Sequence, residues 1–407
     1  MSRLQASSRA VVLLFAASLL LAAMPAPAET VDTNPLNRTP EVRDAFQRFY
    51  SMRYDDAIGR FQKIQSEHPG DAMATDYLLD AILFRELNRL DLLDTTFYAN
   101  DGFLTGKHTV AENPATRDQI KALADQAVRE ANAELKTNPN DVNALFARGW
   151  ARSLQATYLG MAERAFTAGL KQALGARSDC DRALELDPNY VDAKLVVGVY
   201  QYVVGALPFA FKVVVGFVGI HGSKTEGMAM LRDDGARGVI TTVEAKTAMM
   251  LFLRREARYQ EAVGIARGLA DQYPHDYLFM LEEANLEKDG GQGMVAVATY
   301  ERLIDLAQRP GYFPEAHLEL AYFGLGDSLR GQKRYGDAVD AYSKGAFQPS
   351  TSPELKRRCL LRAGESYDLM GNRAKAVQEY EAVLQAGSDT AQGESARKYL
   401  RSGYAGN

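Results

Sequence analysis

Small and apolar residues recur along this chain at positions typical of paired helices. An alanine precedes a proline by twelve residues four times, at Ala57/Pro69, Ala127/Pro139, Ala176/Pro188 and Ala262/Pro274. Four segments also share one apolar rhythm: RYDDAIGRF at 53–61, RYQEAVGIA at 258–266, RYGDAVDAY at 334–342 and NRAKAVQEY at 372–380. A proline ends a helix because it lacks the amide hydrogen that a continuing helix needs. The pattern therefore predicts repeated helical hairpins rather than strands.

A second small residue stands twelve positions before the alanine in four copies, and an aromatic residue follows that alanine by four positions. The small pairs are Ala45 with Ala57, Ala284 with Ala296, Gly326 with Ala338 and Gly364 with Ala376, and the aromatic residues are Phe61, Tyr300, Tyr342 and Tyr380. We expect two antiparallel helices to touch at each small pair, and the aromatic ring to fill the gap against the next hairpin. An ordinary helical bundle with coincidental alanines is the alternative.

The repeated alanines are 34 residues apart from Ala262 to Ala296, then 42 apart to Ala338 and 38 apart to Ala376. A period of 34 residues, with short insertions in two copies, resembles the tetratricopeptide repeat family. This resemblance implies an all-α fold: a right-handed superhelical solenoid of antiparallel helix pairs, with about eight hairpins and an interruption in the middle. Each hairpin of such a solenoid contacts only its neighbours, so we expect an elongated body without a central core.

The rhythm divides the chain into four segments. Residues 1–28 read as a signal peptide, 29–190 as irregular helical repeats, 191–239 as an apolar helical insertion within a repeat, and 240–407 as regular repeats that end in a polar capping helix at about 390–401. In the second segment we expect a hairpin at 39–69 and helices at 71–88, 115–137, 141–158 and 160–186. The intervening stretch 90–114 has no helical period and is expected to be a binding loop or a surface excursion.

The N-terminus has the features of an export signal. Arg3 and Arg9 precede an apolar run from Ala10 to Met24, and Ala26-Pro27-Ala28 offers a small-x-small cleavage site. We expect export with cleavage after Ala28, to a periplasm in a Gram-negative-type bacterium and otherwise to the outside. An uncleaved membrane anchor is the alternative, but the run of about 15 residues is shorter than the roughly 20 that a spanning helix needs.

Charge and cysteine content narrow the classes of partner. Without residues 1–28 the chain has 45 Lys and Arg against 52 Asp and Glu, a net charge of −7. An acidic surface argues against nucleic acid as a partner. The two cysteines, Cys180 and Cys359, lie in distant repeats, so we expect both to be buried and unpaired rather than joined in a disulfide.

The stretch from Val196 to Ile220 is the most apolar part of the expected mature chain. Pro208 and four glycines (Gly198, Gly205, Gly216 and Gly219) divide it into two pieces of about a dozen residues. Apolar helices of that length are usually buried. Burial between repeats is therefore expected, with a hairpin facing a membrane surface or a partner, or a true membrane span, as alternatives.

A narrower resemblance covers about residues 188–255. The run Gly-Ala-Leu-Pro at 205–208 and the sequence GIHGSKTEGMAML at 219–231 are similar to the central segment of the tetratricopeptide repeat protein 39 and fungal inclusion-body clearance family. Members of that family are described as non-enzymatic helical repeat proteins linked to lipid droplets, membranes or protein aggregates. This chain differs in its export signal, so the resemblance implies only a non-catalytic scaffold with an apolar central insertion.

Motifs for metals, cofactors and catalysis are missing from the sequence. The five histidines (His68, His108, His221, His275 and His317) are scattered, without a His-x-x-x-His or Cys-x-x-Cys spacing. The glycine-rich stretch 324–331 lacks the Gly-Lys-Ser/Thr ending of a phosphate loop and is expected inside a repeat helix. We therefore expect no cofactor, no metal and no enzyme activity.

A concave peptide-binding groove is the remaining candidate site. In a solenoid of this kind the first helix of each hairpin lines the concave wall. Helical spacing places Phe323, Asp327 and Arg330 on one groove-facing stripe, and Arg358, Arg362 and Glu365 on the next. Arg358 and Arg362 could grip a carboxylate, as in half of the clamp by which some tetratricopeptide proteins hold a partner's C-terminus. Phe323 and Asp327 replace the lysine and asparagine of the other half, so a groove for another peptide, or a plain solvated face, are the alternatives.

The sequence thus favours an exported, non-catalytic scaffold that binds a protein or peptide partner on its concave face. The rival hypothesis is a membrane-associated assembly factor, or a factor that handles lipids or hydrophobic ligands through residues 196–220. The partner's identity and the oligomeric state are not encoded in any motif of this sequence.

Overall fold

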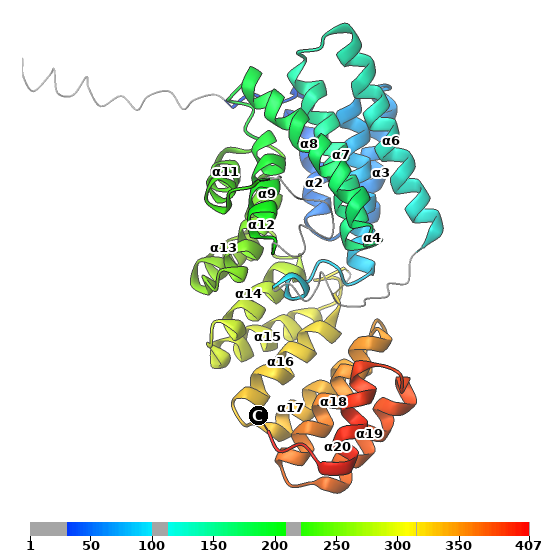
Figure 1. Ribbon diagram of the computed structural model, residues 1–407, viewed down its shortest axis with the longest axis vertical. Helices are drawn as coiled ribbons and strands as arrows, with labels where there is room; N and C mark the ends of the chain where they lie inside the picture. The colour runs from blue at the N-terminus through cyan, green and yellow to red at the C-terminus, as the bar shows by residue number, and fades with distance from the viewer. Residues whose placement is uncertain (1–30, 100–112, 209–220, 315, 407) are drawn as a thin grey trace, which may run out of the picture.

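The structure is a computed structural model that describes residues 31–99, 113–208, 221–314 and 316–406. All regular elements among these residues are helical, with seventeen α-helices and two short 3-10 helices (Figure 1). The predicted all-α class is therefore confirmed.

Within the described residues, consecutive helices pack as antiparallel pairs, and eight such pairs follow one another before a final helix. The pairs are α2 (Pro40–Phe49) with α3 (Tyr54–Glu67), α4 (Ala72–Arg89) with α6 (Pro114–Thr137), α7 (Val142–Met161) with α8 (Phe166–Leu186), α9 (Ala193–Ala206) with α11 (Lys224–Arg237), α12 (Thr242–Arg255) with α13 (Tyr259–Gln272), α14 (Tyr277–Asp289) with α15 (Gly293–Ala307), α16 (Leu318–Gly331) with α17 (Tyr335–Ala346), and α18 (Pro353–Leu369) with α19 (Arg373–Gly387). Helix α20 (Ala391–Ser402) closes the stack, and the 3-10 helices are η1 (Pro35–Arg38) and η2 (Thr95–Tyr98). The expected number of hairpins is confirmed.

The turn inside a hairpin has a recurring backbone conformation. The residue two positions before the second helix has a positive φ in several copies: 60° at Met52, 55° at Ala257, 62° at Lys333 and 73° at Gly371. A left-handed residue at this position ends the first helix and redirects the chain into the second. The next two residues, Arg-Tyr in three copies and Asn-Arg in the fourth, are the N-cap and the first residue of the second helix of the hairpin.

The small residues pack as the sequence predicts. Both members of the pairs Ala45/Ala57 and Ala284/Ala296 are fully buried, as are Ala338 and Ala376. A Cβ atom at Gly326 would lie 2.5 Å from the ring of Tyr342, and one at Gly364 would lie 2.6 Å from the ring of Tyr380. Glycine is therefore required where these rings cross the first helix.

The aromatic residues differ from the expectation in one respect. The rings of Tyr342 and Tyr380 pack on the first helix of their own hairpin instead of only filling the gap to the next hairpin. The hydroxyl group explains this, because Tyr342 donates to Asp327 (2.7 Å) and Tyr380 donates to Asp368 (2.9 Å). Tyr300 does both, donating to Asn285 of its own hairpin and lying against Gly324 of the next.

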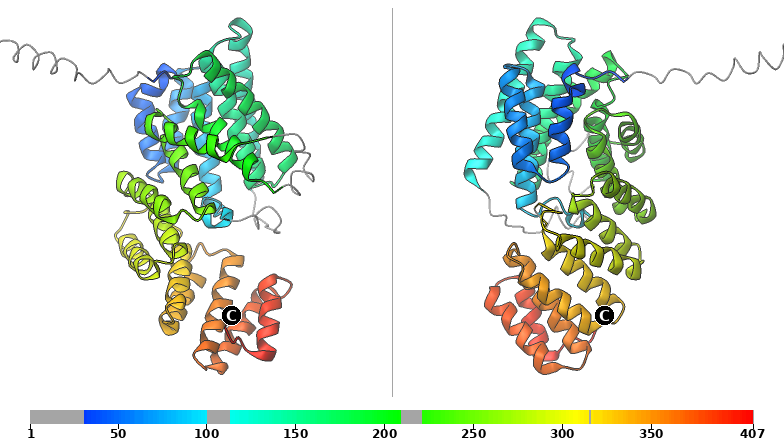
Figure 2. Two further views of the ribbon diagram at one scale, coloured as in Figure 1. Left: turned by 60° about the vertical axis from the view of Figure 1, so that its left-hand side comes forward. Right: turned by 180° about the vertical axis from the view of Figure 1, so that it is seen from behind.

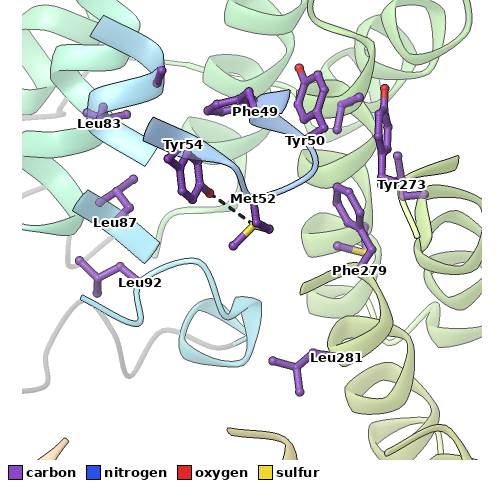
Figure 3. Close-up of a cluster of buried hydrophobic side chains, with 14 of the residues drawn as sticks. Phe49, Tyr50, Met52, Tyr54, Leu83, Leu87, Leu92, Tyr273, Phe279 and Leu281 are labelled. Carbon is purple, nitrogen blue, oxygen red and sulfur yellow. Dashed lines mark hydrogen bonds between the residues drawn. The ribbon is translucent and has the colours of Figure 1, made fainter. Parts of the chain in front are cut away.

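The expectation that each hairpin contacts only its neighbours is wrong. The end of α2 approaches α12, and the end of α4 approaches α14, where Tyr277 donates to Asn88 (3.2 Å); Figure 2 shows the N-terminal helices next to the middle of the chain. The hydroxyl of Tyr50 donates to Glu244 on α12 (2.5 Å), and its ring lies 5.1 Å from that of Tyr273. Side chains from the α2–α3 turn and the end of α4 face residues of α13 and α14 in one buried apolar cluster (Figure 3). The N-terminal part of the solenoid therefore folds back onto its middle.

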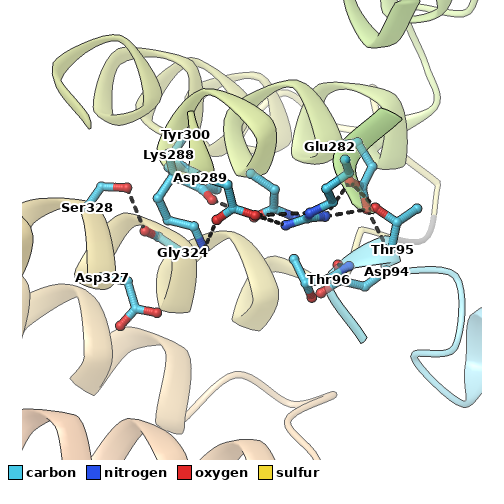
Figure 4. Close-up of polar contacts among 12 residues, drawn as sticks. Asp94, Thr95, Thr96, Glu282, Lys288, Asp289, Tyr300, Gly324, Asp327 and Ser328 are labelled. Carbon is cyan, nitrogen blue, oxygen red and sulfur yellow. Dashed lines mark hydrogen bonds and ion pairs between the residues drawn. The ribbon is translucent and has the colours of Figure 1, made fainter. Parts of the chain in front are cut away.

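A buried polar network reinforces this closure (Figure 4). The backbone amide and the hydroxyl of Thr95 in η2 both donate to Glu282 on α14, at 2.7 Å each. Arg254 on α12 donates to Thr95 (2.8 Å) and to Glu282 (3.2 Å), and it also pairs with Asp289. Arg254 and Glu282 are only 3% and 2% exposed, so each charge depends on its partners rather than on water.

Both cysteines are buried and free, as expected from their separation along the chain. Burial raises the pKa of the Cys359 thiol to about 12, which keeps it protonated at neutral pH. These residues therefore act as small apolar side chains in the core.

Candidate functional site

The predicted peptide-binding residues lie on two adjacent first helices near the C-terminal end. Helix α16 contacts α18, and α18 contacts α20, so these three helices form one continuous face. Phe323, Asp327 and Arg330 lie on α16, and the other three predicted residues lie on α18. The structure places the two predicted stripes on helices that contact each other.

Arg358 and Phe323 form the first contact between the stripes. The guanidinium group of Arg358 lies 4.4 Å from the centre of the Phe323 ring. Phe323 is 9% exposed, so it supports the arginine rather than presenting an open apolar surface. Among the described residues no carboxylate pairs with Arg358, which remains half-exposed. A cation held over an aromatic ring is positioned for an acidic group from outside.

The other four residues pair with one another. Glu365, which is 3% exposed, forms an ion pair with Arg330 (3.0 Å) across the helices and accepts a hydrogen bond from Arg362 (2.8 Å) on its own helix. Arg362 also lies 3.9 Å from Asp327, which accepts the Tyr342 hydroxyl. Nearby carboxylates raise the pKa of Arg362 although burial opposes that rise. Arg358 and Arg362 therefore have different partners, and a two-arginine carboxylate clamp stays a sequence prediction without support from this geometry.

An extended segment of the chain itself covers the far side of this face. After α20 the chain turns back at Gly403, and Tyr404 reaches α16 and α18. The Tyr404 amide donates to Asp368 (2.7 Å), its hydroxyl accepts from Arg330 (2.9 Å), and the Arg330 guanidinium lies 5.3 Å from its ring. The face thus holds a non-helical peptide segment through one backbone group and one aromatic side chain.

Sequence reasoning missed Asp368 and Tyr404. Asp368 lies three residues after Glu365, so it continues the stripe on α18, and this spacing could have identified it. It also accepts from Tyr380 and pairs with Arg373, which fixes its carboxylate. No spacing rule relates Tyr404 to Arg330, because they are separated by 74 positions.

The apolar central segment is described only up to Pro208, and the predicted second piece at 209–220 lies outside the described residues. In the first piece, α9 packs on α11 so closely that a Cβ at Gly227 would lie 2.6 Å from the Gly198 carbonyl oxygen. Most of α9 is buried, although Val203 is 40% exposed. In the described part of the chain no helix has the length and apolarity to cross a membrane.

The glycine-rich stretch and the histidines singled out in the sequence have identifiable surroundings where the structure describes them. The stretch 324–331 lies within α16, as expected, and its first two glycines accommodate tyrosine rings. His68 and His221 are exposed, and Nδ1 of His275 donates to the backbone carbonyl of Tyr312 (2.9 Å). His108 lies outside the described residues. His317 lies beside Asp91 and Glu319, an arrangement that histidine spacing could not reveal.

Comparisons with known proteins agree with the repeat architecture. Residues 358–386, the end of α18 and most of α19, match the tetratricopeptide repeat family. A search among curated protein sequences gives no significant match. Because the matched stretch lies outside residues 188–255, the narrower resemblance to the tetratricopeptide repeat protein 39 family has no support from any comparison.

Similar solved structures are distant in sequence. A chain of the APC/C hetero-tetramer Cut9–Hcn1 is 12% identical, with 90% of this chain and 57% of that chain covered and a TM-score of 0.49. This chain thus spans little more than half the length of that structure. PilW, a type IV pilus biogenesis factor, is 17% identical over 61% of this chain and 98% of its own, with a TM-score of 0.42. Yeast Tom70 is 10% identical over 89% and 88%, with a TM-score of 0.38. The chain therefore contains a tetratricopeptide repeat at residues 358–386, within a stack of helix pairs of the same architecture.

Proposed function

We propose that this protein is an exported, non-catalytic scaffold that binds an extended segment of a protein partner on the face of α16, α18 and α20. The helix-pair architecture is typical of proteins that offer a preformed surface to other proteins. Binding in this proposal uses side chains that are already held in place, so little ordering is needed when the partner docks.

The docked tail is the observation that carries the proposal. Tyr404 engages the face through a backbone N–H to Asp368 and an aromatic ring with a hydroxyl at Arg330. Any extended peptide with a tyrosine offers the same groups. Arg358, stacked on Phe323, adds a cation for an acidic side chain of such a peptide. The tail therefore serves as an intramolecular example of the ligand.

The ion pairs of the face support a preformed binding surface. The Glu365 carboxylate accepts a hydrogen bond from Arg362 and forms an ion pair with Arg330. The pairs hold α16 and α18 in a fixed relation and leave Arg358 to meet a partner.

Affinity capture with a chain of residues 29–407 tests this function. Deleting residues 403–407 should increase the amount of captured partner, because the tail no longer competes for Arg330 and Asp368. Replacing Arg358 with alanine should decrease it. Arg401→Ala, an exposed arginine on α20, is the matched control and should leave capture unchanged. Identical recovery of the same proteins by all four forms would contradict the proposal.

Export is tested separately by analysing the N-terminus of the protein made in its native host. The proposal expects a chain that begins at Glu29 and lies outside the cytoplasmic fraction. A full-length chain starting at Met1 in the cytoplasm would contradict it, without affecting the proposed binding face.

A further inference from the structure

Three potential metal ligands meet where the turn after α4 touches the start of α16. Asp91 follows α4, and His317 and Glu319 lie at the beginning of α16. One ligand atom from each of the three side chains lies within 4.8 Å of the other two. Because Asp91 and His317 are 226 positions apart, this meeting depends on the closure of the N-terminal part onto the later repeats.

The surrounding structure fixes each of the three side chains. Asp91 has a φ of 57°, a left-handed backbone conformation in the turn that follows α4, and its carboxylate contacts His317. The His317 ring is stacked parallel to Tyr277, with ring centres 6.0 Å apart. The second carboxylate oxygen of Glu319, Oε2, accepts from Ser350 (2.6 Å). Side chains held near one another in this way need little further ordering to bind an ion, which would take the place of the Nδ1 proton between His317 and Asp91.

The described side chains leave one carboxylate oxygen of the cluster without a hydrogen-bond donor. The Nδ1 atom of His317 contacts Asp91 and lies 3.5 Å from Oε1 of Glu319. One ring nitrogen carries at most one proton, so it can serve only one of these two carboxylates. Glu319 is fully buried, and no hydrogen-bond donor among the described residues reaches its Oε1 atom. An acceptor buried in this way is costly unless something positive binds it.

We propose that Asp91, His317 and Glu319 bind one divalent transition-metal ion, for which Zn²⁺ is the best fit. A neutral imidazole nitrogen and two carboxylate oxygens are ligands that Zn²⁺ accepts, and two carboxylates balance its charge. Ca²⁺ and Mg²⁺ are disfavoured because they prefer oxygen ligands alone. The ion would join the end of α4 to the start of α16 and so fasten the N-terminal part to the C-terminal repeats.

Metal binding is measured on the chain of residues 29–407 after chelator treatment. Titration with Zn²⁺ and Co²⁺ by calorimetry should give one ion per chain, and the visible spectrum of bound Co²⁺ should show a nitrogen and oxygen ligand set. Zn²⁺ should also raise the melting temperature, because it binds only the folded state. Asp91→Asn and Glu319→Gln should each weaken the affinity about tenfold or more, while His68→Gln, an exposed histidine elsewhere, should not change it.

Two results would overturn the proposal. One is the absence of stoichiometric binding and of a thermal shift in the unaltered protein. The other is binding that survives both acidic substitutions, which would mean an adventitious ion elsewhere. Asp91→Asn is the decisive variant if Glu319→Gln fails to fold, because Asp91 is only part-buried in its turn. If His317 and Asp91 form only an ion pair and bind no metal, Asp91→Asn should lower the melting temperature by the same amount with and without Zn²⁺. Equal decreases would therefore also contradict the proposal.

Discussion

At the scale of single residues, glycine and tyrosine determine how closely the helices of a hairpin approach. Tyr342 lies across Gly326, and Tyr380 lies across Gly364, each with its hydroxyl bonded to an aspartate of the first helix. The small pairs could be predicted from the sequence because their spacing is fixed by the hairpin. The tyrosine hydroxyl bonds could not, since the repeat pattern specifies only that the position is aromatic.

Replacing Gly326 with alanine should destabilise the protein by about 1–3 kcal/mol, because the added methyl group overlaps a ring that is fully buried and hydrogen-bonded. Gly268→Ala on α13 is the matched control, since nothing lies within 4 Å of its Cβ position. That change should stabilise the protein by up to about 1 kcal/mol through helix propensity. Urea unfolding of both variants measures the difference. Equal effects of the two substitutions would contradict the role assigned to the tyrosine ring.

In the candidate site, too, the sequence predicted the positions of the residues along each helix but not their contacts. Phe323, Asp327, Arg330, Arg358, Arg362 and Glu365 could be placed on two stripes because helical periodicity is local. Their pairing could not be predicted, because it depends on the offset between α16 and α18. That offset places Arg358 over the Phe323 ring and lets Glu365 pair with an arginine of each helix.

At the scale of elements, the hairpins follow the sequence closely but α4 does not behave as an ordinary repeat helix. Its residues from Ala72 to Leu83 are buried on every side, including Asp76 and Asp80. Neither carboxyl group has a hydrogen-bond partner among the described residues. A helix with two acids one turn apart would normally be assigned a solvated face, so the sequence pattern alone could not reveal this burial.

Burial of these acids predicts a specific pH dependence. It raises the pKa of Asp76 and Asp80 well above the usual value and that of the neighbouring Glu244 to about 7. The folded chain therefore binds protons that the unfolded chain has released. The stabilisation from these three carboxyl groups is fully present below about pH 4, and it is lost as the pH rises through their pKa values in the folded state. The free energy of unfolding should fall between pH 5 and pH 8.

Asp80→Asn should reduce that fall by about 1 kcal/mol or more, since an amide does not ionise. Asp305→Asn, whose side chain is 74% exposed, should leave it unchanged. Urea titrations of the three proteins at pH 5 and pH 8 give the comparison. A fall of the same size in Asp80→Asn and in the unaltered protein would show that the carboxyl group is not buried as the structure has it.

At the scale of the whole molecule, closure of the N-terminal part onto α12 to α14 distinguishes this protein from a solenoid held only by neighbouring contacts. The residues that meet are far apart in the sequence, such as Thr95 with Glu282 and Tyr50 with Glu244. Contacts between residues so far apart produce no periodic pattern in the sequence. The repeat pattern alone therefore predicted an elongated body. The proposed metal cluster was missed for the same reason.

Replacing Arg254, the buried cation of the polar network with Thr95 and Glu282, should destabilise the folded state strongly. Arg254→Met leaves Glu282 buried without its charged partner and should destabilise the protein by about 3–5 kcal/mol. The loss should be larger at pH 8 than at pH 6, because Glu282 can take up a proton at the lower pH. Arg309→Met removes an exposed pair with Asp305 and should cost less than about 1 kcal/mol. Thermal and urea unfolding measure both variants. Similar small losses of unfolding free energy for Arg254→Met and Arg309→Met would show that the Arg254 network does not stabilise the contact between the N-terminal part and α12 to α14.

The most direct measurement concerns the face of α16, α18 and α20. A chain ending at Ser402 is titrated with a synthetic peptide of residues 402–407 and followed by NMR. The account predicts saturable binding in the millimolar range, since the attached tail benefits from a high effective concentration. Arg330→Ala and Asp368→Asn should each abolish the shifts, while Arg401→Ala should retain them. No saturable binding, or binding that both substitutions leave intact, would contradict the claim that this face recognises an extended peptide.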